Sequence, residues 1–190
     1  MNFDQKTFFL TKNLPKIAYF SQIKTRGFQS PNDEFAAKKE FVSKFGPDIP
    51  DNFIIDKIKY FVSKDIVLQL DTGFGLIASY LKESKINIFT VDSTPNQNAF
   101  CQIINLDYKK AIDIIKSNVL FLTHPTPNSA EILDCVKLFN GDKIIWIANE
   151  NPNADKLLIG YLFRKFYVAQ KYQIDNFGNK KNTIFFLKRK

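Results

Sequence analysis

The chain has 190 residues, of which 45% are hydrophobic and 24% charged, as in ordinary folded globular proteins. A chain of this length buries roughly 70% of its unfolded surface, so we expect one domain with a substantial core. No apolar run approaches the roughly 20 residues that span a bilayer, and the first residues do not resemble a secretory signal peptide. The sequence therefore argues against a membrane protein and predicts a cytoplasmic one.

The net charge of +8 raises the question of nucleic-acid binding. Arginine, the better bidentate ligand of phosphate, occurs only as Arg26, Arg164 and Arg189, and the lysines are dispersed along the chain. A solvated basic surface is the favoured explanation, and weak contact with nucleic acid remains open.

The two cysteines, Cys101 and Cys135, do not form a Cys-x-x-Cys pair, and the chain has a single histidine. We therefore expect no metal site. A disulfide between the two cysteines has no support in the sequence, so two reduced thiols are the predicted state.

The N-terminal part differs in pattern from the rest of the chain. The first thirty residues show no clean period, yet their many apolar side chains predict an extension that docks on the core. A proline and two acids at residues 31–34 predict the start of a helix that ends before Gly46. We expect an N-terminal extension and helix over residues 1–45 and a main domain over residues 46–190.

Beyond that first helix the pattern becomes an alternation of strands and helices. Continuous apolar strands between amphipathic helices are typical of a parallel sheet that is covered on both faces. We expect strands at residues 66–70, 86–91, 102–105, 119–123 and 143–148, and helices after residue 51 and near residues 76–83, 107–117, 129–139 and 153–166. Two further strand-like runs, 167–175 and 183–188, are joined by a short turn-rich loop, which predicts an antiparallel hairpin.

The strand at residues 66–70 leads into a turn with two glycines, Gly73 and Gly75, and then directly into a helix. Glycines let a ligand approach the backbone, and the helix start offers unpaired N–H groups at its positive end. The next strand ends at Asp92, where an acidic side chain binds ribose hydroxyls in dinucleotide-type folds. This pattern predicts a nucleotide-sized pocket; an ordinary turn capped by Asp71 is the alternative.

This order of elements resembles the class I S-adenosylmethionine-dependent methyltransferases over roughly residues 46–190. The resemblance implies a three-layer α/β, Rossmann-like fold with a mostly parallel seven-stranded sheet in the order 3-2-1-4-5-7-6, whose seventh strand is antiparallel. It also implies S-adenosylmethionine as the cofactor, bound by Gln69, Asp71, Gly73, Gly75, Asp92 and Ser93.

The cofactor motif departs from the family pattern at two positions. The family motif reads acidic residue, apolar residue, then G-x-G-x-G, and Gly73 and Gly75 match its second and third glycines. Gln69 replaces the acid, which in the family contacts the amino-acid end of the cofactor. Asp71 replaces the first glycine and is the candidate to take over that contact.

The run His124-Pro125-Thr126-Pro127 follows the strand at residues 119–123 and resembles the family's fourth motif, N/D-P-P-aromatic, which holds the methyl acceptor. The resemblance implies catalytic roles for His124, Pro125 and Thr126. The near-neutral pKa of a histidine suits accepting a proton from an oxygen or nitrogen nucleophile. The carboxyl end of a central strand is also where open α/β sheets bind ligands. A purely structural role for this histidine is the alternative.

The leading hypothesis is an S-adenosylmethionine-dependent methyltransferase whose acceptor the sequence does not identify. Because Gln69, Asp71, Thr126 and Pro127 each depart from the family pattern, a catalytically inactive binding or scaffold module is the alternative. Another nucleotide-binding α/β protein, such as an NAD-dependent one, is a third hypothesis. The fourth motif lacks the aromatic side chain that stacks on a flipped base, which argues against sequence-specific DNA methylation.

Overall fold

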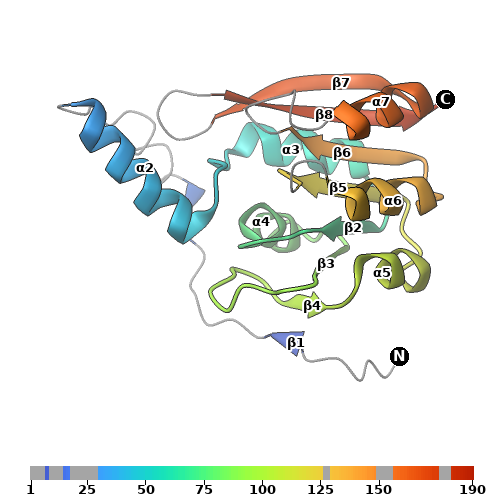
Figure 1. The fold of residues 1–190 in the computed structure, drawn as a ribbon, viewed down its shortest axis with the longest axis horizontal. Helices are drawn as coiled ribbons and strands as arrows, with labels where there is room; N and C mark the ends of the chain where they lie inside the picture. Colours follow the sequence, from blue (N-terminus) through green and yellow to red (C-terminus); the bar gives the residue numbers. More distant parts are fainter. Residues whose placement is uncertain (1–6, 9–14, 18–29, 126–128, 149–155, 176–180) are drawn as a thin grey trace.

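The computed structural model describes residues 7–8, 15–17, 30–125, 129–148, 156–175 and 181–190 (Figure 1). The centre of the molecule is one eight-stranded sheet in the order β1-β4-β3-β2-β5-β6-β8-β7. Its strands are β1 (Thr7–Phe8), β2 (Val67–Leu70), β3 (Ile88–Asp92), β4 (Ile103–Asn105), β5 (Val119–Thr123), β6 (Lys143–Ile147), β7 (Phe166–Asp175) and β8 (Lys181–Arg189).

Seven of these strands confirm the predicted order 3-2-1-4-5-7-6. Strands β2 to β6 pair in parallel, whereas β8 is antiparallel to both β6 and β7, as expected of a hairpin that inserts its last strand into the sheet. Leu70 at the end of β2 pairs with Val91 of β3 and with Leu122 of β5. The carboxyl ends of these three strands therefore meet at one edge of the sheet.

The eighth strand, β1, is not predicted by the sequence. It consists of two residues that pair in antiparallel fashion with β4 at the edge of the sheet. A strand this short shows no period, so only the pairing with β4 reveals it. A smaller correction concerns Phe166, which was expected in a helix and is the first residue of β7.

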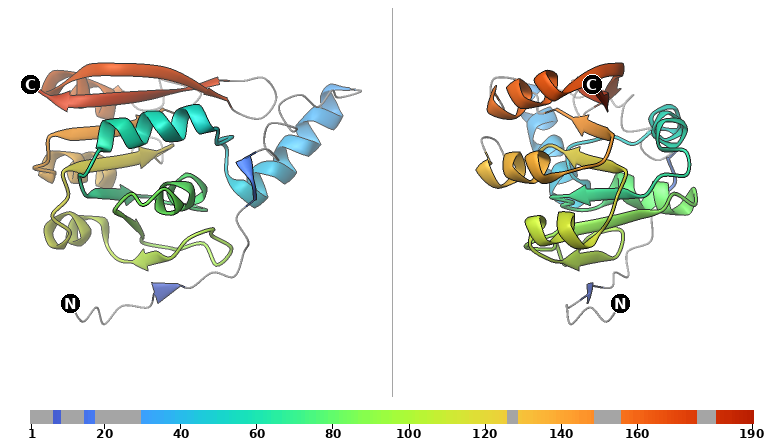
Figure 2. Two further views of the ribbon diagram at one scale, coloured as in Figure 1. Left: turned by 180° about the vertical axis from the view of Figure 1, so that it is seen from behind. Right: turned by 90° about the vertical axis from the view of Figure 1, so that its right-hand side faces the viewer.

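Helices cover both faces of the sheet and give three layers (Figure 2). Helices α3 (Asn52–Val62) and α4 (Leu76–Glu83) lie on one face, and α5 (Tyr108–Ile114), α6 (Ala130–Leu138) and α7 (Lys156–Lys165) lie on the other. The three-layer α/β architecture that the sequence predicts is therefore confirmed. Among the described residues, no helix combines the length and the apolar character needed to cross a membrane.

Side chains of the central strands alternate between two apolar layers. Val67 and Phe121 pack on the side of α3 and α4, whereas Leu68 and Leu120 pack on the side of α5, α6 and α7. All four side chains are fully buried. Burial on both faces explains why these strands are continuous apolar runs in the sequence.

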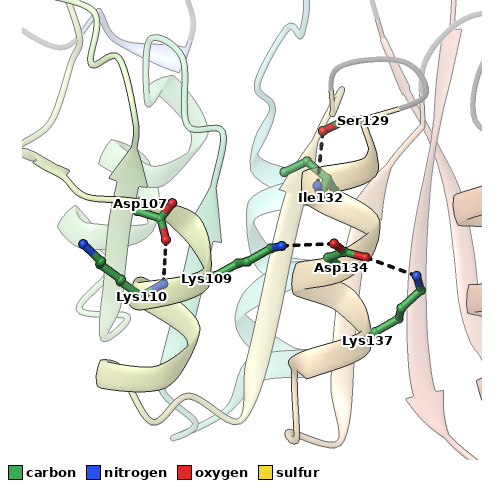
Figure 3. Close-up of polar contacts among 7 residues, drawn as sticks. All are labelled: Asp107, Lys109, Lys110, Ser129, Ile132, Asp134 and Lys137. Carbon is green, nitrogen blue, oxygen red and sulfur yellow. Dashed lines mark hydrogen bonds and ion pairs between the residues drawn. The ribbon is translucent and has the colours of Figure 1, made fainter.

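Helices α5 and α6 are capped and linked by polar side chains (Figure 3). The Asp107 carboxylate accepts a hydrogen bond from the Lys110 N–H at 2.9 Å and caps α5, and Ser129 caps α6 in the same way. Lys109 reaches across to Asp134 at 3.0 Å. Because this ion pair is exposed, the packing of the buried faces contributes more to holding the two helices together.

Helix α2 (Pro31–Phe45) has the bounds that the sequence predicts. Ser30 caps its start, and Gly46, with a φ of +86°, ends it in a conformation that favours glycine. Figure 1 shows α2 projecting from one end of the sheet, and Phe41 is its buried side chain. The division of the chain at residue 45 remains a prediction.

Candidate functional site

A pocket of about 290 Å³ opens at the carboxyl ends of β2 and β5. It is lined by the turn after β2, the start of α4, the end of β5 with His124, and the segment from the end of α2 to Asp48. The predicted site residues on its wall are Gln69, Asp71, Gly73, Gly75 and His124. Asp92, Ser93 and Pro125 are not among the lining residues, and Thr126 lies outside the described residues.

The turn after β2 holds three residues with positive φ: Asp71 at +53°, Gly73 at +57° and Gly75 at +64°. The two glycines serve different purposes. A Cβ atom on Gly75 would lie 2.6 Å from the Cys101 Sγ, whereas a Cβ on Gly73 would have no atom within 4 Å. Gly75 is therefore required by packing, and Gly73 faces open space where a ligand can approach the backbone.

Asp92 anchors this turn to the neighbouring strand. Its buried carboxylate accepts hydrogen bonds from the Gly73 N–H at 3.1 Å and from the Thr94 N–H at 2.9 Å. Thr72 adds a second link, because its hydroxyl donates to the Val91 carbonyl at 2.9 Å. The carboxylate predicted to bind ribose thus has an observed role in shaping the glycine turn.

Ser93 follows Asp92 and contacts the buried phenol of Tyr108 on α5. Burial raises the pKa of Tyr108 to about 12, the hydrogen bond with Ser93 opposes this rise, and the charges of Asp71 and Asp92 add to it. The phenol is therefore neutral at physiological pH and adds no charge to this side of the turn.

Gln69 presents an unsatisfied acceptor to the site. Its side-chain nitrogen donates to the Thr123 hydroxyl at 3.1 Å, which links β2 to β5. Its Oε1 atom is buried and has no hydrogen-bond partner among the residues that the structure describes. A buried unpaired acceptor is costly, so this atom fits a ligand that carries a hydrogen-bond donor or a positive charge.

His124 stands at the end of β5 with a φ of +47°, and its N–H donates to the Ile147 carbonyl at 3.0 Å. Its Nε2 atom lies 2.8 Å from Oδ1 of Asp48, and the Asn182 amide donates to the same oxygen at 3.0 Å. Asp48 also lines the pocket, whereas Asn182 is buried at the start of β8.

The sequence analysis missed both partners of His124. They lie 76 and 58 positions away from it in the chain, in an interhelical segment and in a hairpin strand. An aspartate between Pro47 and Pro50 is a weak sequence signal, and no local pattern around Asn182 indicates a site.

An aromatic wall closes the side of the pocket nearest to α2. Phe45 lines the pocket and stacks on Phe100, with ring centroids 5.8 Å apart. Phe74 lines the same wall, and its carbonyl accepts a hydrogen bond from the Phe100 N–H at 2.7 Å. Phe45 and Phe74 thus give this wall of the pocket an apolar surface.

Comparison of the sequence alone finds no protein-family model and no curated protein that matches the chain. Comparison of the structure finds many matches at high probability. A magnesium protoporphyrin IX methyltransferase from Synechocystis PCC 6803 with bound S-adenosyl-L-homocysteine aligns with a TM-score of 0.51 and 11% identity, over 91% of this chain and 93% of that one.

Two RNA-modifying enzymes with bound S-adenosyl-L-homocysteine align similarly. A tRNA (uracil-54, C5)-methyltransferase from Pyrococcus abyssi has a TM-score of 0.54 at 12% identity over 71% of this chain, which spans 37% of that enzyme. A 16S rRNA methyltransferase has a TM-score of 0.52 at 10% identity, over 82% of this chain and 65% of that one.

The chain has the class I methyltransferase fold. The resemblance inferred from the sequence is thus confirmed at the level of the fold. In this methyltransferase-like fold the pocket lies at the strand-turn-helix where the sequence predicts the cofactor.

Proposed function

We propose that this protein is an S-adenosylmethionine-dependent methyltransferase. The observation that carries the proposal is the pocket itself, because one open volume brings Gln69, Asp71, Gly73 and Gly75 together with His124. The first four were predicted to bind the cofactor and His124 to act on the acceptor. Methyl transfer needs these two regions side by side, since alignment of the reacting groups provides much of the acceleration.

The residues present fit the cofactor in charge and shape. The unpaired Oε1 atom of Gln69 and the Asp71 carboxylate suit the ammonium group at its amino-acid end. Gly73 leaves room for close approach to the backbone. Asp92 accepts two backbone hydrogen bonds, and because a carboxylate has about four acceptor positions it retains capacity for a ribose hydroxyl. Ser93 is proposed as a further polar contact.

His124, Pro125 and Thr126 are proposed as the acceptor end of the site. When bound, the cofactor would supply a methyl group already activated on a positively charged sulfur. The chain itself then has to orient the acceptor, exclude water and accept a proton if the acceptor carries one. The apolar wall of Phe45 and Phe74 would provide the dehydrated surface.

Isothermal titration calorimetry with S-adenosylmethionine and S-adenosyl-L-homocysteine tests the proposal, with NAD as the competing ligand. We expect binding of the first two and none of NAD. Gly73→Arg should abolish binding, because a long charged side chain would extend from the turn into open space. Gly160→Arg is the matched control, since Gly160 is exposed on α7, also has no atom near its Cβ position and lies away from the pocket.

A catalytically inactive binding or scaffold module is the second candidate function. It is favoured by the backbone hydrogen bonds of Asp92 and by the departures of Gln69 and Asp71 from the family motif. Absence of heat and of a thermal shift at millimolar S-adenosylmethionine would select this candidate. Binding of NAD instead would select a dinucleotide-dependent protein.

A further inference from the structure

Helix α3 presents aromatic rings and a lysine on the part of its surface that faces away from the core. Phe53, Lys57 and Tyr60 follow one another at spacings of four and three residues, so they form one stripe along the helix. The Phe53 ring is 53% exposed and the Tyr60 ring is 80% exposed. Large rings this exposed contribute little to the stability of the core, so burial does not explain them.

The hairpin of β7 and β8 lies beside α3 and extends this surface (Figure 2). Phe186 of β8 packs edge-on against Phe61 of α3, with ring centroids 5.0 Å apart. Alternate residues of a strand point to the same face of the sheet, so Lys188 lies on the α3 side as well. Tyr167 of β7 is the register partner of Lys188, and both side chains are exposed. The sheet thus adds one ring and one cation to the stripe.

Three side chains connect α3 directly to β7. The ammonium group of Lys57 lies 5.1 Å from the ring centroid of Phe53 and 5.2 Å from that of Tyr172. The two rings meet edge-on, with centroids 5.3 Å apart. These contacts already order the cation and both rings, so a ligand that binds them loses little side-chain freedom.

This surface begins at the edge of the sheet that carries the pocket. Tyr172 pairs with Ile184, and Ile184 pairs with Ile147 at the carboxyl end of β6. On the other side, Phe53 follows Asp48, which lines the pocket, by five residues. A long ligand bound here could therefore extend to the pocket mouth.

The charge of this surface is positive. Residues 166–190 contain six basic residues and one acidic residue. Neither Lys57 nor Lys188 has an ion-pair partner among the residues that the structure describes. The acid on the exposed side of α3, Asp56, is paired with Lys59 at 3.3 Å. The lysines look dispersed in the sequence, but the fold brings Lys57 and Lys188 to one face.

We propose that this face binds single-stranded nucleic acid. Unpaired bases stack on exposed rings whatever their sequence, and lysines beside the rings neutralise the phosphates. Phe53 and Tyr60 are seven residues apart, which is about 10 Å along the helix and matches about three stacked nucleotides. The residues of this aromatic-basic face are Phe53, Lys57, Tyr60, Tyr167, Tyr172 and Lys188.

Other occupants fit the face less well. A duplex keeps its bases stacked on one another, so it does not offer them to the rings. A second copy of the chain would bring like charges together across the contact. An acidic peptide would match the charge but carries no bases for the rings. The inference is independent of the proposed methyltransferase activity, because binding is measured without cofactor.

Fluorescence anisotropy of labelled twelve-nucleotide probes tests the proposal on the full chain. We expect single-stranded RNA and single-stranded DNA of one sequence to bind with micromolar affinity at low salt, because neither stacking nor phosphate contact requires the 2′-hydroxyl. The matching duplex should bind at least about fivefold more weakly. With two phosphate contacts, the logarithm of the association constant should fall with the logarithm of salt concentration at a slope of about −1.4.

Substitutions separate stacking from charge. Tyr60→Ala should weaken binding at least about fivefold, whereas Tyr60→Phe, which keeps the ring, should not. Lys57→Gln should make the salt slope less steep by about 0.7. Lys110→Gln, an exposed change on α5 across the sheet, is the matched control and should leave the slope unchanged. Lys188→Gln tests the same point if Lys57→Gln fails to fold.

Four results would overturn the proposal: no binding of either single strand, tighter binding of the duplex, equal affinity of Tyr60→Ala and Tyr60→Phe, or equally tight binding of poly-glutamate of the same charge. The last result would assign the face to an acidic peptide. Titration with S-adenosylmethionine decides the proposed function separately, so failure of one proposal leaves the other standing.

Discussion

The pocket joins two strand ends that are built in contrasting ways. The end of β2 is organised locally: its turn, glycines and helix start are contiguous, and its anchor Asp92 is 19 positions from Gly73. The end of β5 is organised by distant segments, because His124 has partners in the segment before α3 and in β8. Both ends use residues with positive φ, Asp71 at +53° and His124 at +47°.

This contrast separates the two halves of the site. A local turn can be recognised in a sequence and tolerates little change, because backbone conformation and packing both constrain it. A side chain held by distant partners can be recognised only by its place at a strand end, and its chemistry depends on which groups the fold brings to it. Three substitutions test this distinction, ordered from the largest expected effect to the smallest.

Replacing His124 by Ala should give the largest loss. We expect conversion of S-adenosylmethionine to S-adenosyl-L-homocysteine to fall by roughly 10²–10⁴, the usual contribution of a general base, with almost unchanged cofactor affinity. His124→Gln is the matched control, because its amide nitrogen reaches about as far as Nε2 and can donate to Asp48 but cannot act as the base. Equal activity of His124→Ala and the unaltered protein would show that His124, at the end of β5, has a structural role and no catalytic one.

Replacing Gly75 by Ala should destabilise the fold by about 2–4 kcal/mol, from the positive φ and the clash with the buried Cys101 thiol. Gly73→Ala keeps the strain but lacks the clash, so it should cost only about 1–2 kcal/mol. Urea unfolding monitored by circular dichroism measures both values. If the two variants are equally stable, packing does not distinguish the two glycines.

Replacing Gln69 by Leu should have the smallest effect on stability, within about 1 kcal/mol, because loss of an unpartnered buried acceptor offsets loss of the bond to Thr123. Affinity for S-adenosylmethionine should nevertheless fall at least about tenfold, since a hydrogen bond to a charged group contributes about 1.5–3 kcal/mol. Gln173→Leu removes an exposed Gln–Thr bond of the same 3.1 Å length and should leave affinity unchanged. An unchanged affinity in Gln69→Leu would show that Gln69 links β2 to β5 but does not bind the cofactor.

The sequence by itself determined the layers, the terminal hairpin and the position of the glycine turn, whereas the strand order was implied by the resemblance to a known family. Apolar strands such as 119–123 alternate with amphipathic helices, and a short loop can close only an antiparallel hairpin. Ser30, Asp51, Asp107 and Ser129 cap their helices through bonds to backbone N–H groups three residues on, which is why helix starts can be found from short segments.

The tertiary structure alone decided which groups surround His124 and how Asp92 is used. The packing of the interhelical segment and the terminal hairpin brings Asp48 and Asn182 to one ring, although neither lies near it in the chain. The same holds for β1, whose two residues form a strand only because β4 offers an unpaired edge. Hydrogen bonds between distant segments depend on the whole packed core, so no local pattern in the sequence encodes them.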